Sequence, residues 1–386
     1  MLVAGARILA AYLIFYAALG AAYPFLPVFY SSIGLRLDQI GVLVAVQAAT
    51  MLVVAPVWGG LSDRFPRSRT ALPLAAAIAT VGALIVYLAG GFAAILIASV
   101  VWFVGLAGVS PMLDARTLET LGPAARNRFG QVRAFGSLSF VIATLLVGLI
   151  LDANGPRSLF WVYIPLLALT IAVTAAIPRR GGTRSVSLRN GAREILAVPG
   201  VPILLAGFVV VWAALTGTNT FFSIQMIAIG GTGAMVGLAW AIGAMVEIPI
   251  MYSFPRLAQR FGAERLLVVG ALAFAMRTAL SALATDPVVL IAIAPLEGIG
   301  FAGVFVGGVT VLAGRAPAGT GGTAQGLFTA GSGLATIIGS TLGGAIAAAI
   351  GIPGLFLICA GVSVVGAGII AVAVARPTPV RVNPAS

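Results

Sequence analysis

Long apolar runs alternate with short polar breaks along almost the whole chain. A helix needs roughly 20 mostly apolar residues to cross the hydrocarbon core of a bilayer, and each run reaches about that length. The pattern therefore predicts an all-α membrane protein with twelve transmembrane helices. The predicted spans are 7–30, 38–60, 70–90, 92–117, 131–152, 157–177, 200–227, 235–257, 265–283, 287–313, 323–349 and 353–375.

A long polar connection interrupts this pattern near the middle of the chain, between the sixth and seventh runs. It carries several arginines with glycine and serine, which is typical of a cytoplasmic linker with room for a short surface helix. We therefore expect an N-terminal six-helix bundle over 1–178, a linker over 179–198 and a C-terminal six-helix bundle over 199–386.

Residues of the first half recur in the second at a nearly constant distance. The recurring sets are Arg64, Phe65 and Arg69 with Arg260, Phe261 and Arg265, and Gly136, Ser137 and Gly148 with Gly331, Ser332 and Gly343. Repeats at equivalent helices indicate duplication. They predict two six-helix pseudo-repeats related by an axis along the membrane normal, with a solute site between them.

Composition supports the membrane assignment and excludes several functions. Hydrophobic residues make up 60% of the chain and charged residues 8%, with a mean hydropathy of +1.12, which excludes an ordinary soluble domain. The chain has no histidine and a single cysteine, Cys359, so thiolate metal clusters and histidine bases are absent. We find no enzyme constellation and no glycine-rich nucleotide loop, and expect no cofactor. Proton chemistry must fall to carboxylates.

The distribution of the basic residues indicates how the chain is oriented in the membrane. All 22 are arginines, and by the predicted topology 18 lie on the side of both termini and two, Arg36 and Arg157, on the other. The positive-inside rule then predicts cytoplasmic termini in the inner membrane. This distribution also argues against nucleic acid as a partner. The first run is too long for a signal-peptide core and lacks a cleavage pattern, so we expect a retained helix.

Five charged residues fall inside the predicted spans: Asp114, Arg133, Glu247, Arg277 and Glu297. Inserting each charged side chain into the bilayer costs about 2.5–3.5 kcal/mol. Charged residues within spans therefore tend to pair with one another and to mark the pathway of a solute or ion. Asp114 and Arg133 lie near the same end of consecutive helices and can meet, either for function or as a structural pair. Glu247 and Arg277 both reach about 18–20 Å into their spans and can pair near the midplane, where a static ion pair is the competing interpretation.

Neutral polar residues supply further candidates. Gln47, Asn219, Gln225 and Gln325 can hydrogen-bond a polar solute from a cavity, although each can equally join one helix to another.

The turn after the second span carries a recognisable motif, Gly59-Gly60-Leu61-Ser62-Asp63-Arg64-Phe65-Pro66-Arg67-Ser68-Arg69. It resembles the G-x-x-x-D-R-x-G-R-R signature of the major facilitator superfamily, with Pro66 in place of glycine and Ser68 at a basic position. The resemblance implies conformational gating by Gly59, Asp63, Arg64 and Arg67. The alternative is a basic turn that only sets topology.

A narrower resemblance covers nearly the whole chain. Its motifs are Tyr23-Pro24-Phe25-Leu26-Pro27, Pro111-Met112-Leu113-Asp114, Phe129-Gly130-Gln131-Val132-Arg133, Glu247-Ile248-Pro249 and Ala324-Gln325-Gly326-Leu327. Together they are similar to the branch that holds lactose permease, phenylpropionate permease and nucleoside–proton symporters. The resemblance implies that Asp114 and Arg133 bind solute. Among the neutral polar residues, Asn219 and Gln225 are the further candidates for solute binding. The resemblance also implies that Glu247 is a coupling or solute-binding carboxylate, with Arg277 controlling its protonation through charge. Glu297 lies near mid-depth in its own span, and we expect Glu247 or Glu297 to exchange the coupling proton.

Departures from that branch leave the solute open. Lactose permease has a histidine where Glu297 stands, and its proton-carrying glutamate position falls at Gly300. We therefore expect a secondary transporter of a small organic solute, of the sugar, nucleoside or aromatic acid class, working by proton symport. A proton-coupled drug or metabolite efflux antiporter of the same fold is the main alternative, and a non-transporting receptor a lesser one.

Overall fold

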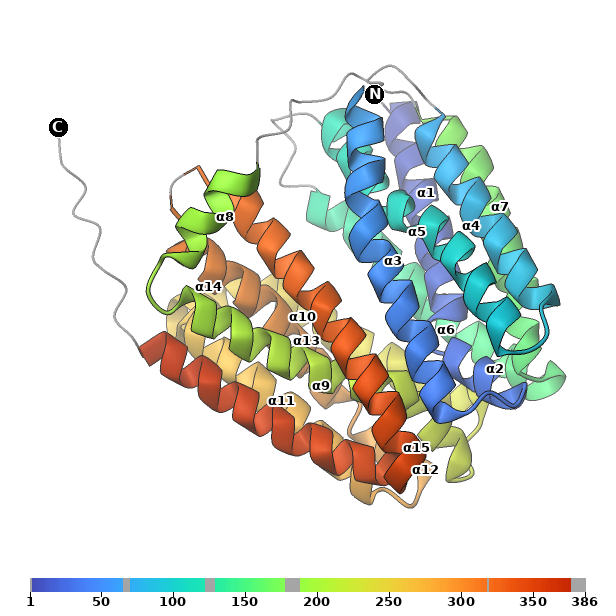
Figure 1. The fold of residues 1–386 in the computed structure, drawn as a ribbon. Helices are drawn as coiled ribbons and strands as arrows, with labels where there is room; N and C mark the ends of the chain where they lie inside the picture. The colour runs from blue at the N-terminus through green and yellow to red at the C-terminus, as the bar shows by residue number, and fades with distance from the viewer. Residues whose placement is uncertain (1, 65–69, 122–128, 178–187, 318, 376–386) are drawn as a thin grey trace.

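The protein is described from a computed structural model that covers residues 2–64, 70–121, 129–177, 188–317 and 319–375. These residues form helices joined by short turns, which confirms the predicted all-α architecture. Two groups of helices lean apart toward one side of the molecule, the side on which α1 begins and α15 ends (Figure 1). We call this the terminal side and the other the far side.

The first group holds six spans, one of them built from two helices. Its helices are α1 (Leu2–Ala22), α2 (Leu26–Ser32), α3 (Leu37–Arg64), α4 (Ala71–Leu88), α5 (Phe92–Leu121), α6 (Phe129–Asn154) and α7 (Leu159–Ala175). The break between α1 and α2 falls at Tyr23-Pro24-Phe25, since proline lacks the N–H that a continuous helix needs.

The second group follows a short helix, α8 (Leu188–Leu196), which lies within the predicted linker. Its helices are α9 (Val201–Ala228), α10 (Gly233–Phe261), α11 (Ala263–Leu283), α12 (Pro287–Ala292), α13 (Pro295–Phe301), α14 (Gly307–Arg315) and α15 (Gly321–Ala375). A π-helical segment, Ala302–Val306, joins α13 to α14. The predicted span 287–313 is thus three helices and a π segment rather than one regular helix.

The spans agree with the predicted number once α15 is divided. Eleven described helices are long and apolar enough to cross a membrane. The last, α15, has 55 residues, and Gly351 interrupts it with a left-handed φ of 81°. At 1.5 Å per residue an unbroken helix of that length would be about 80 Å long, far beyond a bilayer. The chain therefore reverses at Gly351, and its two arms are the eleventh and twelfth spans (Figure 1).

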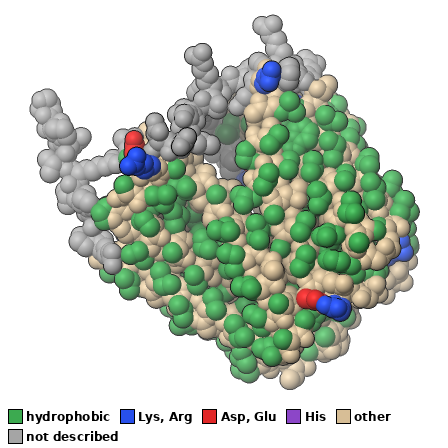
Figure 2. Space-filling model, in the orientation of Figure 1, with side chains coloured by type: hydrophobic (Ala, Val, Ile, Leu, Met, Phe, Trp, Pro, Cys, Tyr) green, Lys and Arg blue, Asp and Glu red, His purple; other side chains and the backbone are tan. Residues whose placement is uncertain are grey.

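Hydrophobic side chains are spread over the whole visible surface, and few charged side chains show on it (Figure 2). Many large side chains on the outer faces of the spans, such as Leu149, Val269 and Val365, are more than half exposed. A soluble protein would bury such residues, whereas lipid is their natural solvent.

Two buried arginines occupy equivalent places in the two groups. Arg116, on α5, donates to the Thr174 carbonyl of α7, and Arg315, on α14, donates to the Ala373 carbonyl of α15. Each pair is separated by 58 residues. Cations favour helix C-termini, where carbonyls lack partners within the helix, so both halves close a helix end in the same way. This shared contact, an arginine that donates to a carbonyl at the end of another helix, supports the internal repeat.

The two groups meet along two glycine seams on the far side, where α3 packs on α15 and α6 on α10. A Cβ added at Gly41 would lie 2.3 Å from the Ser340 carbonyl oxygen, and one at Gly237 would lie 2.5 Å from the Thr144 carbonyl oxygen. Gly41 and Gly237 are 196 residues apart, as are Thr144 and Ser340. The seams are thus repeats of one contact, and only glycine permits this backbone approach.

Candidate functional site

Two connected cavities lie between the helix groups. The central cavity, of about 320 Å³, is lined by residues including Trp212, Asn219, Trp240, Glu247 and Glu297. The vestibule, of about 1020 Å³, extends toward the terminal side, where Ala192 of α8 and Gln325 of α15 form part of its wall. Tyr23, Gln47, Trp212 and Thr336 line both cavities, so they form one path. Figure 2 shows the hollow between the groups at that side.

A buried network of three residues lies at one wall of the central cavity, which two of them, Asn219 and Glu297, line. Arg277 Nη1 lies 3.0 Å from Glu297 Oε2 and donates a 2.9 Å hydrogen bond to Asn219 Oδ1. Asn219 Nδ2 in turn donates a 2.8 Å bond to Glu297 Oε1. The Arg277 side chain is 4% exposed and that of Glu297 15%. The amide thus bridges the two charges, and Asn219 takes a place between them that the sequence did not predict.

The partner of Arg277 differs from the predicted one. We expected Glu247 to pair with Arg277, but the structure places Glu297 there instead. The break before α13 at Pro295 and the π segment after it change the direction in which Glu297 points. Such irregular turns within spans frequently occur at functional sites.

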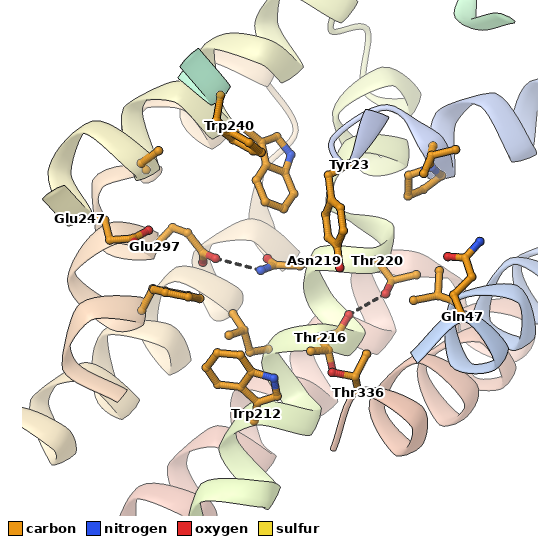
Figure 3. Close-up of a pocket in the computed structure, with 18 of the residues that line it drawn as sticks. Tyr23, Gln47, Trp212, Thr216, Asn219, Thr220, Trp240, Glu247, Glu297 and Thr336 are labelled. Carbon is orange, nitrogen blue, oxygen red and sulfur yellow. Dashed lines mark hydrogen bonds between the residues drawn. The ribbon is translucent and has the colours of Figure 1, made fainter. Parts of the chain in front are cut away.

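Glu247 lies beside this network on α10 (Figure 3). The close approach of α10 and α13 depends on Gly298, because a Cβ there would lie 2.4 Å from the Gly243 carbonyl oxygen and 2.7 Å from the Glu247 nitrogen. Two carboxylates, Glu247 and Glu297, therefore line one small cavity, and among the described residues Glu247 forms no ion pair.

The predicted contact of Asp114 with Arg133 is confirmed. Arg133 Nη1 lies 3.3 Å from Asp114 Oδ2, and the hydroxyl of Tyr12 donates to Asp114 Oδ1 at 2.5 Å. The Arg133 guanidinium also lies 5.9 Å from the centre of the Tyr16 ring, which stacks on Tyr12. Asp114 lines the vestibule rather than the central cavity. The two predicted charge groups therefore occupy different parts of the path.

Gln225, predicted to bind solute, does not reach either cavity. It is 4% exposed and lies six residues beyond Asn219 on α9. Six residues correspond to about 240° around a helix, which leaves the two side chains about 120° apart on different faces.

The gating motif is only partly visible. Gly59 and Arg64 lie at the end of α3, both exposed, and no atom would contact a Cβ added at Gly59. Arg67 lies outside the described residues, as does the side chain of Asp63. The predicted gating role of Gly59, Asp63, Arg64 and Arg67 therefore stays a prediction.

Asn219, a predicted candidate, belongs to a row of cavity residues on α9 whose other members, Trp212, Thr216 and Thr220, the sequence did not predict. Trp212, Thr216, Asn219 and Thr220 all line the central cavity (Figure 3). Their spacing of four, seven and eight residues from Trp212 places them on one helix face. That spacing is visible in the sequence, but the surrounding residues of α9 are so apolar that the polar face does not stand out.

The lining has an uneven charge. Three acids, Asp114, Glu247 and Glu297, line the two cavities, whereas no arginine is among their described lining residues. Indole and phenyl rings, including Trp212, Trp240 and Phe301, supply apolar faces around the acids of the central cavity. Pockets of this kind, mostly apolar with a few placed polar groups, suit a small organic molecule.

Comparison with known sequences identifies relatives. The MFS_1 like family matches residues 6–358. A maltose permease of Geobacillus stearothermophilus is 29% identical over 280 residues, which cover 72% of this chain and 70% of the permease. A multidrug resistance protein of Serratia proteamaculans is 26% identical over 279 residues, covering 65% of this chain and 64% of that protein.

Solved structures share the fold. The nucleoside transporter NupG superposes with a TM-score of 0.86 at 15% identity, covering 97% of this chain and all of that one. The peptide transporter PepTSo superposes with a TM-score of 0.76 at 10% identity, over 96% of this chain and 97% of that one. The predicted major facilitator fold is thereby confirmed, with two helix groups around a central path.

Proposed function

Because the chain belongs to the MFS_1 like family of membrane transporters, we propose that it moves a small organic solute across the inner membrane by proton symport and alternating access. The two predicted bundles, 1–178 and 199–386, would rock about the central cavity, with the 179–198 linker between them. The function is transport rather than enzymatic catalysis.

The observation that supports proton coupling is the pair of carboxylates in the central cavity. Glu297 Oε2 is buried and has no hydrogen-bond partner among the described residues, although Arg277 lies near it. Glu247 lies beside it on the cavity wall and forms no ion pair with any described residue. A buried carboxylate with unfilled bonding capacity is costly when charged, so proton binding offsets that cost. We assign the coupling proton to Glu247 and Glu297, with Arg277 as the charge that controls its release.

Solute binding is assigned to both cavities. Asn219 and the α9 row face the central cavity, and Asp114 with Arg133 would meet the solute in the vestibule. The acidic lining disfavours the aromatic acid class among the expected solutes, because the described lining residues of the two cavities include three acids, and Arg133 and Arg277 are already paired with two of them. A neutral solute such as a sugar or a nucleoside fits better, since hydroxyl and N–H groups donate to carboxylates and aromatic rings cover the apolar face.

The orientation follows from the arginine distribution. With both termini cytoplasmic, the terminal side faces the cytoplasm and the vestibule is open inward. The motif at the end of α3, with Gly59, Asp63, Arg64 and Arg67, would then contribute to closing the cytoplasmic side in the alternate state.

The test is solute-evoked proton movement. Purified protein in liposomes with an internal pH dye is challenged with sugars, nucleosides, aromatic acids and cationic drugs. We expect a neutral solute to carry protons in its own direction, and Glu247→Gln to abolish this movement. Gln225→Leu is the matched control, since Gln225 is buried outside both cavities, and it should leave proton movement intact. Proton coupling that survives in both Glu247→Gln and Glu297→Gln would refute the assignment.

The second candidate function is efflux by proton antiport. It is favoured by the similarity to a multidrug resistance protein and by the largely apolar walls of the vestibule. In that case a cationic drug competes with the proton for the same carboxylate, and the dye reports proton movement opposite to that of the solute.

A further inference from the structure

One side chain joins the two helix groups through backbone hydrogen bonds on the far side. The Asp152 carboxylate, in the last turn of α6, accepts from the Gly233 N–H at 2.5 Å and from the Ala234 N–H at 2.9 Å. Gly233 and Ala234 are the first two residues of α10. An acid from the first group therefore caps a helix of the second.

The location of Asp152 is unfavourable on its own helix. The C-terminal turn of a helix carries partial negative charge from unpaired carbonyls, which repels a carboxylate. The N-terminus of α10 carries partial positive charge and free N–H groups, which attract it. The favourable contact thus comes entirely from the opposite group, and it exists only while the seam between α6 and α10 is closed.

The glycines around Asp152 make this contact possible. A Cβ at Gly148 would lie 2.5 Å from the Gly233 carbonyl oxygen, and one at Gly233 would lie 2.7 Å from the Gly148 carbonyl oxygen. The backbones of α6 and α10 therefore touch one turn before Asp152, which brings its carboxylate to the first N–H groups of α10. The seam and the cap form together.

The equivalent seam lacks such a cap. Asp152 corresponds to Ala348, because the seam residues of the two halves are 196 positions apart. An alanine offers no acceptor, so the α3–α15 seam has glycine packing alone. Two similar seams thus hold the helix groups together on the far side. The α6–α10 seam also has the charged Asp152 cap.

We infer that Asp152 is a gate residue of the transport cycle, which holds the far side closed while the cavity is open at the terminal side. The inference rests on the alternating access of the proposed function but on no solute or proton. When the groups separate on the far side, the carboxylate loses both N–H donors and stays beside the negative end of its own helix. Asp152 therefore favours the state seen here over the state with the far side open.

The experiment measures from which side the cavity can be reached. Thr336 lines both cavities, and Cys359, the single cysteine, is buried. In a Cys359→Ala background, Thr336→Cys is labelled with a membrane-impermeant cationic thiol reagent in inside-out and right-side-out vesicles. The ratio of the two labelling rates reports the balance between the two states, with or without transport activity.

We expect Asp152→Ala to shift this ratio roughly 2- to 30-fold toward labelling from the far side, the range for losing a helix cap. Asp152→Asn keeps the shape but loses the charge and one acceptor, so it should shift the ratio less. Thr232→Ala is the matched control, because Thr232 accepts from the Met235 N–H on its own helix, a contact that does not cross between the two groups.

Two results would contradict the assignment of Asp152 as a gate residue. One is an unchanged labelling ratio in Asp152→Ala protein that is monodisperse and unfolds at the wild-type temperature. The other is an equal shift in Thr232→Ala, which would indicate general loosening of α10. A loss of proton coupling in the liposome assay, with the labelling ratios as expected, would reject the proposed function and leave the gate intact.

Discussion

Arg277 illustrates what a charge costs when a span buries it. The guanidinium contacts both Glu297 and Asn219 and lies over the Phe222 ring, 4.5 Å from its centre. Its Nε has no hydrogen-bond partner among the described residues, so the site is not fully satisfied even in this state. Buried ion pairs are expensive to form and more expensive to break, because the remaining charge has no partner.

This arrangement predicts an asymmetry between single and double replacements. We expect Arg277→Gln to lower the free energy of unfolding by about 3–5 kcal/mol, since it leaves Glu297 charged and unpaired. Arg277→Gln with Glu297→Gln should recover most of that loss and still fail to couple protons. Thermal unfolding in detergent and the liposome assay check the two parts. A double variant whose loss equals the sum of the single losses would contradict the pairing.

At the scale of the element, arginines at the ends of α5 and α14 hold the ends of other helices. Arg315 donates to the carbonyls of Ala373 and Val374, and Arg116 donates to that of Thr174. We expect Arg315→Met and Arg116→Met each to destabilise the protein by about 1–3 kcal/mol, because buried acceptors lose a charged donor. Their effects should add, since they lie in different halves. Arg256→Met, at an exposed position of α10, serves as the control in thermal unfolding.

The elements also show how far sequence reasoning reaches. Apolar length predicted every span, because a bilayer imposes one length on all helices. The contact between Asp114 and Arg133 was predictable from two consecutive helices joined by one turn. The partner of Arg277 was not, because it depends on the rotation of α11 against α13 and on the break at Pro295. The α9 row and the cap by Asp152 depend likewise on how distant helices pack.

At the scale of the whole molecule, the two far-side seams favour the conformation in which the far side is closed and the terminal side is open. Gly41→Ala and Gly237→Ala place a methyl group against backbone carbonyls that cannot move without shifting a helix. We expect both to shift Thr336→Cys labelling toward the far side, since the same contact is repeated in the two halves. Gly368→Ala, where no atom lies within 4 Å of the added Cβ, should leave the ratio unchanged. Shifts in opposite directions would show that the two seams are not equivalent.

The reversal of α15 at Gly351 bears on how the chain enters the bilayer. No charged residue lies between Arg315 and Arg376, so both arms and the turn between them are free of charge. The turn can therefore cross the hydrocarbon core without carrying a charged side chain through it, and the pair of helices can insert as one hairpin. Arginines flank both ends of this hairpin and keep them on one side during biogenesis. Because of the reversal at Gly351, the machinery that inserts the chain does not have to orient the last two helices separately.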